Sequence, residues 1–406
     1  MNEGTLWIAA ATGVDPGTPL LGLPLVLRSV LAAERAGFAR ILVEETAGRD
    51  VAAGLSRTRA EILRGGDPEP DIAPGRLVIL TSRVLPQVRW LKELRRIPAE
   101  PERLETDPGC AAVLETRDPS AAVAVLRGRG GQDALESLSA RLAPVGTGLS
   151  SPDRFEFQSP ADPRRAEDWL LSSLIKDNEG FMSRHVERKI SLAVSRRLAS
   201  TRVTPNAMTL VSVAVGLVGA ALFLSPRSGA PLAGALLVLA HSILDGCDGE
   251  LARLKFQESR FGGVLDFWGD NVVHCAFFST IAIAWARAAG EGWPLILGAA
   301  AVLGTIASAG LVYRSTMTGI AEGPLFTSVS RSQTAFARLA DALARRDFLY
   351  LLVLLSAFHR ERWFLALASA GSPVYFLLLA ALARGQRRSR PAVGAVRVDN
   401  SGRSLS

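Results

Sequence analysis

The sequence predicts an N-terminal α/β domain followed by an all-α membrane bundle. Charge and hydropathy divide the 406 residues in this way: residues 1–160 carry 19 Lys+Arg against 21 Asp+Glu, and residues 161–406 carry 27 against 18. The positive excess therefore lies in the part that also holds the long apolar runs, which favours a membrane partner over nucleic acid. The third observation is an alternation of short apolar runs and helical spacing in the first part, typical of an α/β sheet.

Composition excludes several other classes. A hydrophobic content of 48% is enough for a large core, which argues against a disordered chain. The three cysteines, Cys110, Cys247 and Cys275, are odd in number and far apart, which argues against a disulfide scaffold. Four histidines and no CxxC pair argue against a zinc module.

Residues 1–160 are predicted to form the α/β domain. Asp15, Pro16 and Pro19 interrupt the first 30 residues, so we expect no signal peptide there. A Gly/Pro-rich loop follows the first strand, and a helix over Pro24–Ala36 ends at Gly37. Strands connected by helices at this spacing predict a parallel sheet. The expected strands are Leu6–Ala10, Ile41–Glu44, Val78–Leu80, Ala111–Leu114 and Ala122–Leu126.

Residues 161–203 are predicted to be a linker with a juxtamembrane amphipathic helix. Arg184–Leu198 mixes basic and apolar residues at helical spacing, which suits a helix in the cytoplasmic membrane interface. An ordinary positive flank of the first membrane span explains the same residues equally well. Residues 386–406, rich in Arg, Ser and Gly, are expected to be a disordered basic tail.

Residues 204–385 are predicted to hold six membrane spans with both termini in the cytoplasm, at the inner membrane. A helix needs about 20 apolar residues to cross a bilayer, and the fifth candidate is short. The candidates are Ala207–Ser225, Pro231–Leu251, Val264–Ala286, Pro294–Tyr313, Phe348–Phe358 and Trp363–Ala383. Basic residues crowd the loops on one side, and the opposite loops hold only Arg227, Arg287, Arg360 and Arg362, which sets the orientation.

Four carboxylates lie where the second and third spans reach the cytoplasmic side. Asp245 and Asp248 share one helix face at a spacing of three, and Asp266 and Asp270 share another at a spacing of four. Each carboxylate costs on the order of 3 kcal/mol inside a membrane helix. Two antiparallel neighbouring helices would bring all four together, where one or two Mg²⁺ or Mn²⁺ ions would neutralise them.

Small residues and one arginine surround these acids. Gly246 and Gly249 flank the first pair, and Gly262 opens the third span. Because glycine weakens a helix by about 1 kcal/mol, this density suggests that something bulky approaches the backbone. Arg253, one turn after Gly249, can bind a phosphate with two parallel hydrogen bonds. Metal, arginine and open backbone together predict a pyrophosphate site.

These residues resemble a known family signature. The segment Asp245-x-x-Asp248-Gly249-x-x-Ala252-Arg253, then eight residues, then Gly262-x3-Asp266-x3-Asp270, matches all eight fixed positions of the CDP-alcohol phosphotransferases. Thr204-Pro205-Asn206 and Arg346-Asp347 also look like family features. The alternative, a set of charge pairs inside a transporter, would use the nearby Arg253, Lys255 and Arg260.

The resemblance implies a six-helix enzyme, expected to be a homodimer, that releases CMP from a CDP-linked alcohol as an acceptor alcohol attacks. It implies that Asp245, Asp248 and Asp266 bind metal, and that Asp270 is the general base and also touches a metal ion. Asp245, Gly249, Ala252, Arg253 and Gly262 would contact the cytidine diphosphate, and Arg260, Arg314 and Lys255 an acceptor phosphate. His241 and His274, one turn before and after the acids, fit helix packing better than metal binding.

The order of the domains narrows the substrate. An α/β head before such a membrane domain resembles the bifunctional inositol-1-phosphate cytidylyltransferase and di-myo-inositol phosphate phosphate synthases. The stretch Gly22–Arg28 is similar to their nucleotidyltransferase segment, yet no basic residue precedes Arg28 to hold a triphosphate. We therefore expect a nucleotidyltransferase-like but degenerate head.

Three functions stay open from the sequence. The first is an enzyme that makes an inositol-phosphate-type phosphodiester from a CDP-alcohol and a polyol phosphate. The second is a phospholipid synthase that uses CDP-diacylglycerol. The third is a membrane-anchored nucleotide-binding protein without catalysis.

Overall fold

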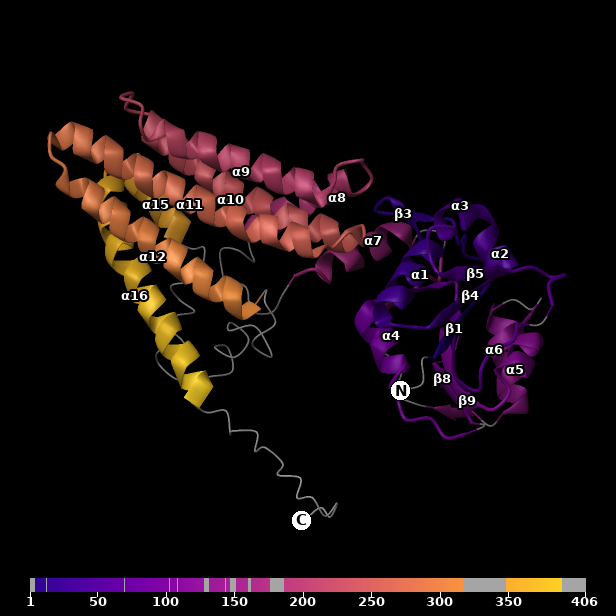
Figure 1. The fold of residues 1–406 in the computed structure, drawn as a ribbon. Helices are drawn as coiled ribbons and strands as arrows, with labels where there is room; N and C mark the ends of the chain where they lie inside the picture. The colour runs from indigo at the N-terminus through magenta and orange to yellow at the C-terminus, as the bar shows by residue number, and fades with distance from the viewer. Residues whose placement is uncertain are drawn as a thin grey trace, which may run out of the picture. The chain divides into compact units, whose positions relative to one another are not determined.

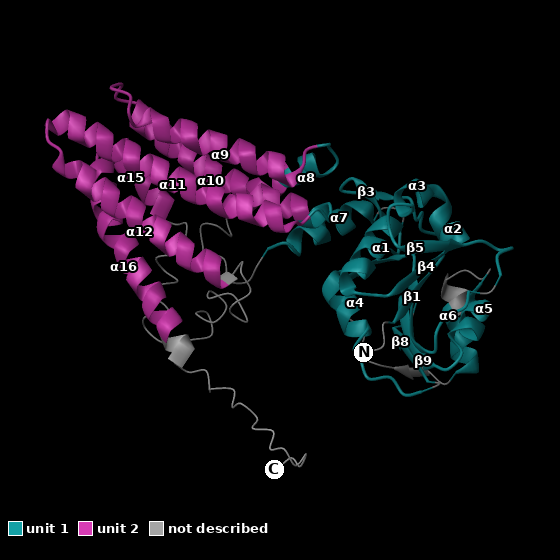
Figure 2. Cartoon of the chain, in the orientation of Figure 1, with its two compact units in different colours: residues 1–176, 195–202, 253–257 teal, residues 177–194, 203–252, 258–406 magenta. Residues whose placement is uncertain are grey.

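The chain forms two compact units (Figure 2), which are described separately. Unit 1 comprises Met1–Lys176, Ser195–Arg202 and Arg253–Gln257, and unit 2 comprises Asp177–Val194, Val203–Ala252 and Glu258–Ser406. The computed structural model describes residues 4–11, 13–68, 70–101, 103–107, 109–127, 131–142, 144–146, 151–159, 162–175, 186–316 and 348–388.

Unit 1 is built on a seven-stranded mixed sheet of order β10-β8-β9-β6-β1-β4-β5 (Figure 1). β1 pairs in parallel with β4 and β6, whereas β9 runs antiparallel to both β6 and β8. Two short antiparallel pairs, β2 with β3 and β7 with β11, stand apart from the sheet. The strands are β1 Thr5–Ala9, β2 Pro19–Leu20, β3 Leu23–Pro24, β4 Arg40–Glu44, β5 Ala60–Leu63, β6 Gly75–Thr81, β7 Val84–Pro86, β8 Leu104–Asp107, β9 Ala111–Thr116, β10 Pro144–Gly146 and β11 Arg154–Glu156.

Helices cover the sheet because its central strands are apolar on both faces. Leu6 and Ile8 of β1 belong to one buried cluster, and the alternate residues Trp7 and Ala9 belong to another. Gly37, at φ 84°, ends α1 in the left-handed conformation that glycine adopts without strain. The helices of unit 1 are α1 Leu25–Ala36, α2 Glu45–Gly48, η1 Arg49–Val51, α3 Ala52–Leu55, α4 Val88–Leu94, α5 Pro119–Leu126, α6 Gly131–Arg141 and α7 Pro163–Ser172.

The predicted head is confirmed as an α/β unit, with two errors. The structure places the expected strand Ala122–Leu126 in α5, because Asp118 caps the helix by accepting a hydrogen bond from the Ala121 N–H, and Pro119 occupies its first turn. The sheet is mixed rather than parallel, since β9 reverses direction. β5 and β8 were not predicted, because neither has a continuous apolar run.

Unit 2 is helical, and five of its helices are long and apolar enough to cross a membrane. The fifth expected span corresponds to α15, which has only 10 residues, so the predicted count of six is not reached among the described residues. The helices are α8 Arg188–Ala199, which extends into unit 1, α9 Pro205–Leu222, α10 Ala230–Leu254, α11 Arg260–Ala289, α12 Trp293–Thr316, α15 Phe348–Ala357 and α16 Glu361–Arg388.

Close helix packing in unit 2 depends on glycines. A Cβ on Gly219 of α9 would lie 2.8 Å from the carbonyl oxygen of Gly234 on α10, and one on Gly234 would lie 2.6 Å from that of Gly219. Gly304 of α12 similarly allows the backbone of Ser372 and Pro373 on α16 to approach. Such contacts favour helix association where lipid removes the hydrophobic driving force.

Candidate active site

Two neighbouring helices, α10 and α11, carry the four predicted carboxylates. α11 begins just after Ser259, whose hydroxyl accepts a hydrogen bond from the Gly262 N–H at 2.9 Å and so fixes the helix start. A connection of a few residues joins it to the end of α10 at Leu254. The two helices are therefore antiparallel, and the acids near the end of α10 lie close to those near the start of α11.

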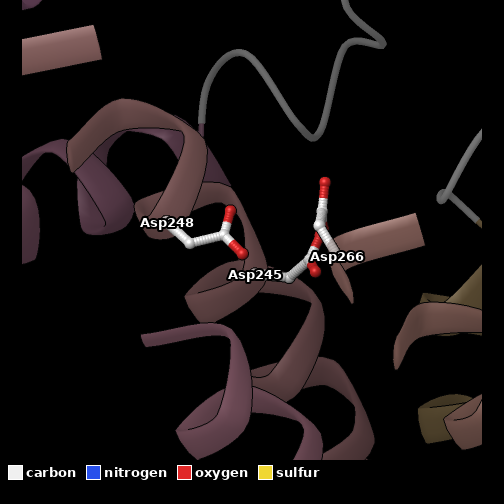
Figure 3. A group of neighbouring side chains, drawn as sticks. All are labelled: Asp245, Asp248 and Asp266. Atoms are coloured by element: carbon white, nitrogen blue, oxygen red, sulfur yellow. The ribbon is translucent and has the colours of Figure 1, made fainter. Parts of the chain in front are cut away.

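Three of the four carboxylates gather at one place (Figure 3). Asp245, Asp248 and Asp266 each offer an oxygen, and these oxygens all lie within 4.8 Å of one another. Asp245 and Asp248 are buried and Asp266 is half-buried. Three like charges this close and largely shielded from water repel strongly, and their hard oxygen atoms are the ligands that Mg²⁺ and Mn²⁺ prefer. The donor set therefore fits a divalent cation.

Thr209 of α9 supports this group, and the sequence reasoning missed it. Its hydroxyl donates a hydrogen bond to Asp248 Oδ2 and is 2% exposed. Thr204 caps α9 by accepting from the Ala207 N–H, and Thr209 lies one turn after Pro205, the first residue of the helix. The signal was present, because the predicted Thr204-Pro205-Asn206 feature precedes Thr209 by one turn.

Asp270, the fourth carboxylate, has different surroundings. It is not part of the group that Asp245, Asp248 and Asp266 form among the described residues. Its Oδ1 instead lies 3.2 Å from Nε2 of His241, which is on α10 and 3% exposed. Three carboxylates thus share one cluster, and the fourth lies near it and faces an imidazole.

The predicted nucleotide-binding residues line the same two helices. Gly249 and Ala252 are half-buried on α10, and Arg253 follows them in its last turn. At Gly262 a Cβ would lie 2.9 Å from Asn206 Oδ1, so this glycine also lets the start of α9 approach α11. Gly246 faces α8 instead, because its Cβ would lie 3.4 Å from Arg188 Nη1. Helix packing, rather than a ligand, explains this last glycine.

The predicted acceptor-phosphate residues do not form one cluster in the structure. Arg260 and Arg314 are exposed, at the start of α11 and near the end of α12. Lys255 Nζ donates to the Thr201 carbonyl at 2.8 Å, within unit 1. Arg346 and Asp347 lie outside the described residues.

Glu250 of α10 forms a buried ion pair with Arg188 of α8, which the sequence did not predict. Glu250 has no exposed side-chain surface, and its Oε1 accepts from Arg188 Nη1 and Ser191 Oγ of α8, each at 2.7 Å. Cys247 Sγ lies 3.6 Å from the Ser191 carbonyl oxygen, as expected of a small packing residue. α8 is thereby held against the helix that carries Asp245 and Asp248.

Just after β1 in the head, backbone N–H groups are already hydrogen-bonded to side-chain oxygens of the protein. The Ala10 N–H donates to Glu44 Oε2 at 2.7 Å, and the Ala11 N–H donates to Ser82 Oγ at 2.8 Å. Burial raises the pKa of Glu44. Arg28, the first basic residue of the chain, donates to the carbonyl oxygens of Leu20, Leu21 and Leu254, all within unit 1. Burial lowers the pKa of Arg28 to about 10.

Residues 202–330 match the family model of CDP-alcohol phosphatidyltransferases. The matched range contains all four aspartates and the complete signature. The matched range is about a third of the chain, and it excludes the α/β head.

Curated relatives align with a stretch of this chain of about the same length as the one that the family model matches. The chain is 40% identical over 130 residues to the "Bifunctional IPC transferase and DIPP synthase" of Thermococcus kodakarensis, covering 32% of this chain and 29% of the relative. It is 41% identical over 148 residues to the protein of the same name from Archaeoglobus fulgidus, covering 36% and 29%. A CDP-diacylglycerol–serine O-phosphatidyltransferase of Mycobacterium leprae is 32% identical over 100 residues, covering 22% and 32%.

The chain also aligns with solved structures of a mycobacterial enzyme. The crystal structure of Mycobacterium tuberculosis phosphatidylinositol phosphate synthase with CDP-DAG bound aligns with a TM-score of 0.33 at 19% identity, covering 49% of this chain and 92% of that one. The same enzyme was also solved in complex with manganese and citrate, with a TM-score of 0.32. At this TM-score the structural likeness carries no argument about this chain.

Proposed function

We propose that this chain is an integral membrane CDP-alcohol phosphotransferase. The observation that carries the proposal is the convergence of Asp245, Asp248 and Asp266 within 4.8 Å, inside a domain that matches the family. An acceptor hydroxyl oxygen attacks the phosphorus that bears the donor alcohol, a new P–O bond forms, and the P–O bond to CMP breaks. The products are a phosphodiester and CMP.

The site residues have distinct roles in this proposal. Asp245, Asp248 and Asp266 hold a divalent cation, Mg²⁺ or Mn²⁺, which would neutralise the pyrophosphate charge. Asp270 is the general base that takes the proton of the acceptor hydroxyl, and its contact with a second ion, which the signature implies, stays part of the proposal. Gly249, Ala252, Arg253 and Gly262 contact the cytidine diphosphate, and Arg260 and Arg314 are candidates for an acceptor phosphate.

Two substrate pairs are in competition. Relatives named IPC transferase and DIPP synthase favour a CDP-polyol donor and a polyol phosphate acceptor. Relatives named serine O-phosphatidyltransferase favour CDP-diacylglycerol and a small polar alcohol. We place the polyol pair first, because its relatives share the higher identity over the longer alignments.

The head is proposed to lack cytidylyltransferase activity. A nucleotidyltransferase holds the triphosphate with the backbone N–H groups of a loop and with nearby cations. Here Glu44 and Ser82 occupy the N–H groups of Ala10 and Ala11, and carbonyl oxygens occupy all three nitrogens of Arg28. The carboxylate of Glu44, at the end of β4 and bonded to this loop, would also repel phosphate.

We further propose that α8 lies at the cytoplasmic membrane surface, with both termini on that side. Val186 and Ile190 are exposed one turn apart, whereas Arg188 and Ser191 place their polar atoms against α10. An apolar outer face flanked by Lys189, Arg196 and Arg197 suits the headgroup region of a bilayer. A homodimer, which the family resemblance implies, remains part of the proposal.

The decisive experiment offers a panel of donors to the purified full-length chain with Mg²⁺ or Mn²⁺. CDP-inositol with inositol phosphate, and CDP-diacylglycerol with serine, glycerol phosphate or inositol phosphate, are incubated separately, and products are identified by mass spectrometry. We expect CMP and a phosphodiester from one donor class, and neither product when EDTA is added. Release of no CMP from any donor would favour a non-enzymatic membrane protein. CDP-inositol formed from CTP and inositol phosphate would show that the head is active.

A further inference from the structure

We propose that His241 is a positioning residue that orients Asp270 for proton removal. This inference rests on the proposed function, in which Asp270 is the general base. His241 lies outside the family signature, and by sequence alone it fits helix packing better than a role in the site. The geometry around its imidazole points instead to a structural partner of the base.

The first argument is the burial of an imidazole without completed hydrogen bonds. His241 is 3% exposed, and neither of its ring nitrogens completes a hydrogen bond with any described residue. A buried polar group left in this way destabilises the fold. An imidazole is therefore a poor choice for packing alone, and leucine would fill the same space at no such cost.

The second argument is what the ring faces. His241 Nε2 lies 3.2 Å from Asp270 Oδ1, a hydrogen-bond distance, although the N–H is not aligned with that oxygen. A small turn of the ring completes the bond, and catalytic hydrogen bonds commonly tighten only when substrate is present. With Oδ1 held by the Nε2–H group, the proposed step uses Oδ2 of Asp270 to receive the acceptor proton.

The third argument is the space that α9 provides for this ring. A Cβ on Gly216 would lie 2.9 Å from His241 Cγ, and 2.7 and 2.8 Å from the two methyl groups of Val273. Glycine inside a helix is destabilising relative to alanine, so its presence here needs a packing reason. Gly216 therefore leaves room for the imidazole between α9 and α11, and α9 limits the directions in which the ring can point.

His274 gives an internal comparison. It lies one turn after Asp270 on α11, as His241 lies one turn before Asp245 on α10. Its ring is 5.5 Å from the Phe277 ring and 5.8 Å from the Phe348 ring, centroid to centroid. His274 thus packs in an aromatic group, whereas His241 faces a carboxylate.

The proton balance of the proposed step is simple. As the acceptor oxygen forms its bond to phosphorus and the bond to CMP breaks, the acceptor proton moves to Asp270 Oδ2. His241 keeps its own proton throughout and gives only the hydrogen bond from Nε2. Its contribution is therefore to the orientation of the carboxylate, with no part in substrate or metal binding.

The test compares substitutions of His241 in the full-length chain, by steady-state CMP release from the donor that wild type uses. His241→Leu keeps the volume and removes the donor, His241→Gln keeps an N–H near the Nε2 position, and His241→Asn has an N–H that is too short. We expect Leu and Asn to lower kcat about 10- to 100-fold, as loss of a supporting hydrogen bond does. The kcat of His241→Gln should be at least about fivefold higher than that of the Leu and Asn variants.

The KM for the donor and the Mg²⁺ concentration for half-maximal rate should stay within about twofold of wild type in all three variants. His274→Leu is the matched control and should keep the wild-type kcat. Wild-type kcat in His241→Leu, or equal kcat in the Gln and Asn variants, would overturn the inference and leave the proposed function intact. If His241→Leu does not fold, the comparison of Gln with Asn decides alone. A wild-type chain that releases no CMP would overturn the proposed function and this inference with it.

Discussion

Buried carboxylates have different neighbours in the two units. In the head, Asp107 lies 2.6 Å from Arg154 Nε, and Glu44 accepts a hydrogen bond from the Ala10 N–H. In unit 2, Asp245, Asp248 and Asp266 bring their oxygens within 4.8 Å of one another. A carboxylate that accepts hydrogen bonds or pairs with a cation contributes to the fold. Carboxylates that lie against one another repel, so such a cluster indicates a ligand that compensates their charge.

Glu250 shows that this difference follows the surroundings of each acid, not the unit it belongs to. It lies two residues after Asp248 on the same helix, and Arg188 and Ser191 compensate its charge. The same helix therefore carries site acids on one face and a structural acid on another. Substitutions on the two faces should separate activity from stability.

The largest expected effect belongs to Asp270. We expect Asp270→Asn to lower CMP release by about 10²- to 10⁴-fold, the usual contribution of a general base. Binding of the CDP-alcohol, measured by equilibrium titration in the presence of Mg²⁺, should remain close to wild type. Activity of Asp270→Asn equal to that of wild type would show that the base is assigned wrongly.

Substitution of Asp248 should affect metal and nucleotide binding together. Loss of a residue that only supports a metal ligand commonly costs 10- to 100-fold in metal affinity or activity. Asp248 is itself a proposed ligand, so we expect Asp248→Asn to raise the Mg²⁺ concentration for half-maximal rate by at least about 100-fold. Binding of the CDP-alcohol should weaken in parallel, as measured in a titration of Mg²⁺ at fixed donor. Thr209→Val, which removes the hydroxyl that contacts Asp248 and the Pro205 carbonyl, should give a smaller shift in the same direction. Unchanged metal dependence in Asp248→Asn would remove this residue from the metal site.

Substitution of Arg188, the ion-pair partner of Glu250, should reduce stability and leave the chemistry of the folded protein intact. Arg188→Met leaves a buried carboxylate without its cation, which we expect to lower the free energy of unfolding by about 3–5 kcal/mol. The double variant Arg188→Met with Glu250→Leu removes both charges and should recover most of that loss. Thermal unfolding in detergent measures both effects. A double variant as unstable as the single one would mean that the pair is not the source of the stability.

The smallest expected effect concerns pH and Glu44. Because burial raises the pKa of Glu44, the folded head binds a proton at a higher pH than the unfolded chain does. This residue therefore contributes more stability as pH falls from neutral towards the usual glutamate pKa, and the contribution is lost as pH rises again. The hydrogen bond from the Ala10 N–H opposes the effect of burial on this pKa, so the change in stability is expected to be small. Pulse proteolysis of the full chain at pH 5 and 7.5 should show a pH-dependent difference from Glu44→Gln, and a constant difference would contradict the assignment.

Local patterns in the sequence predicted much of the fold and the central part of the site. Apolar runs predicted β1, β4, β6 and β9, and Gly37 predicted the end of α1. The spacing of Asp245, Asp248 and Asp266 predicted that they would meet, because helical periodicity fixes which residues share a face. The run Ala122–Leu126 was predicted as a strand, because a short apolar run of β-branched and small residues fits a strand and a helix equally well. The hydrogen bond that Asp118 accepts at the N-terminus of α5 favours the helix.

The sequence by itself determined the acid cluster and the division into an α/β head and a helical part, because both depend on composition and short-range periodicity. Only the tertiary structure decided that Asp270 faces His241, that Glu250 is compensated by Arg188, and that Glu44 closes the loop after β1. These contacts join residues that lie 29, 62 and 34 positions apart in the chain. Helix crossings and strand order set such distances, and no local pattern of side chains specifies them.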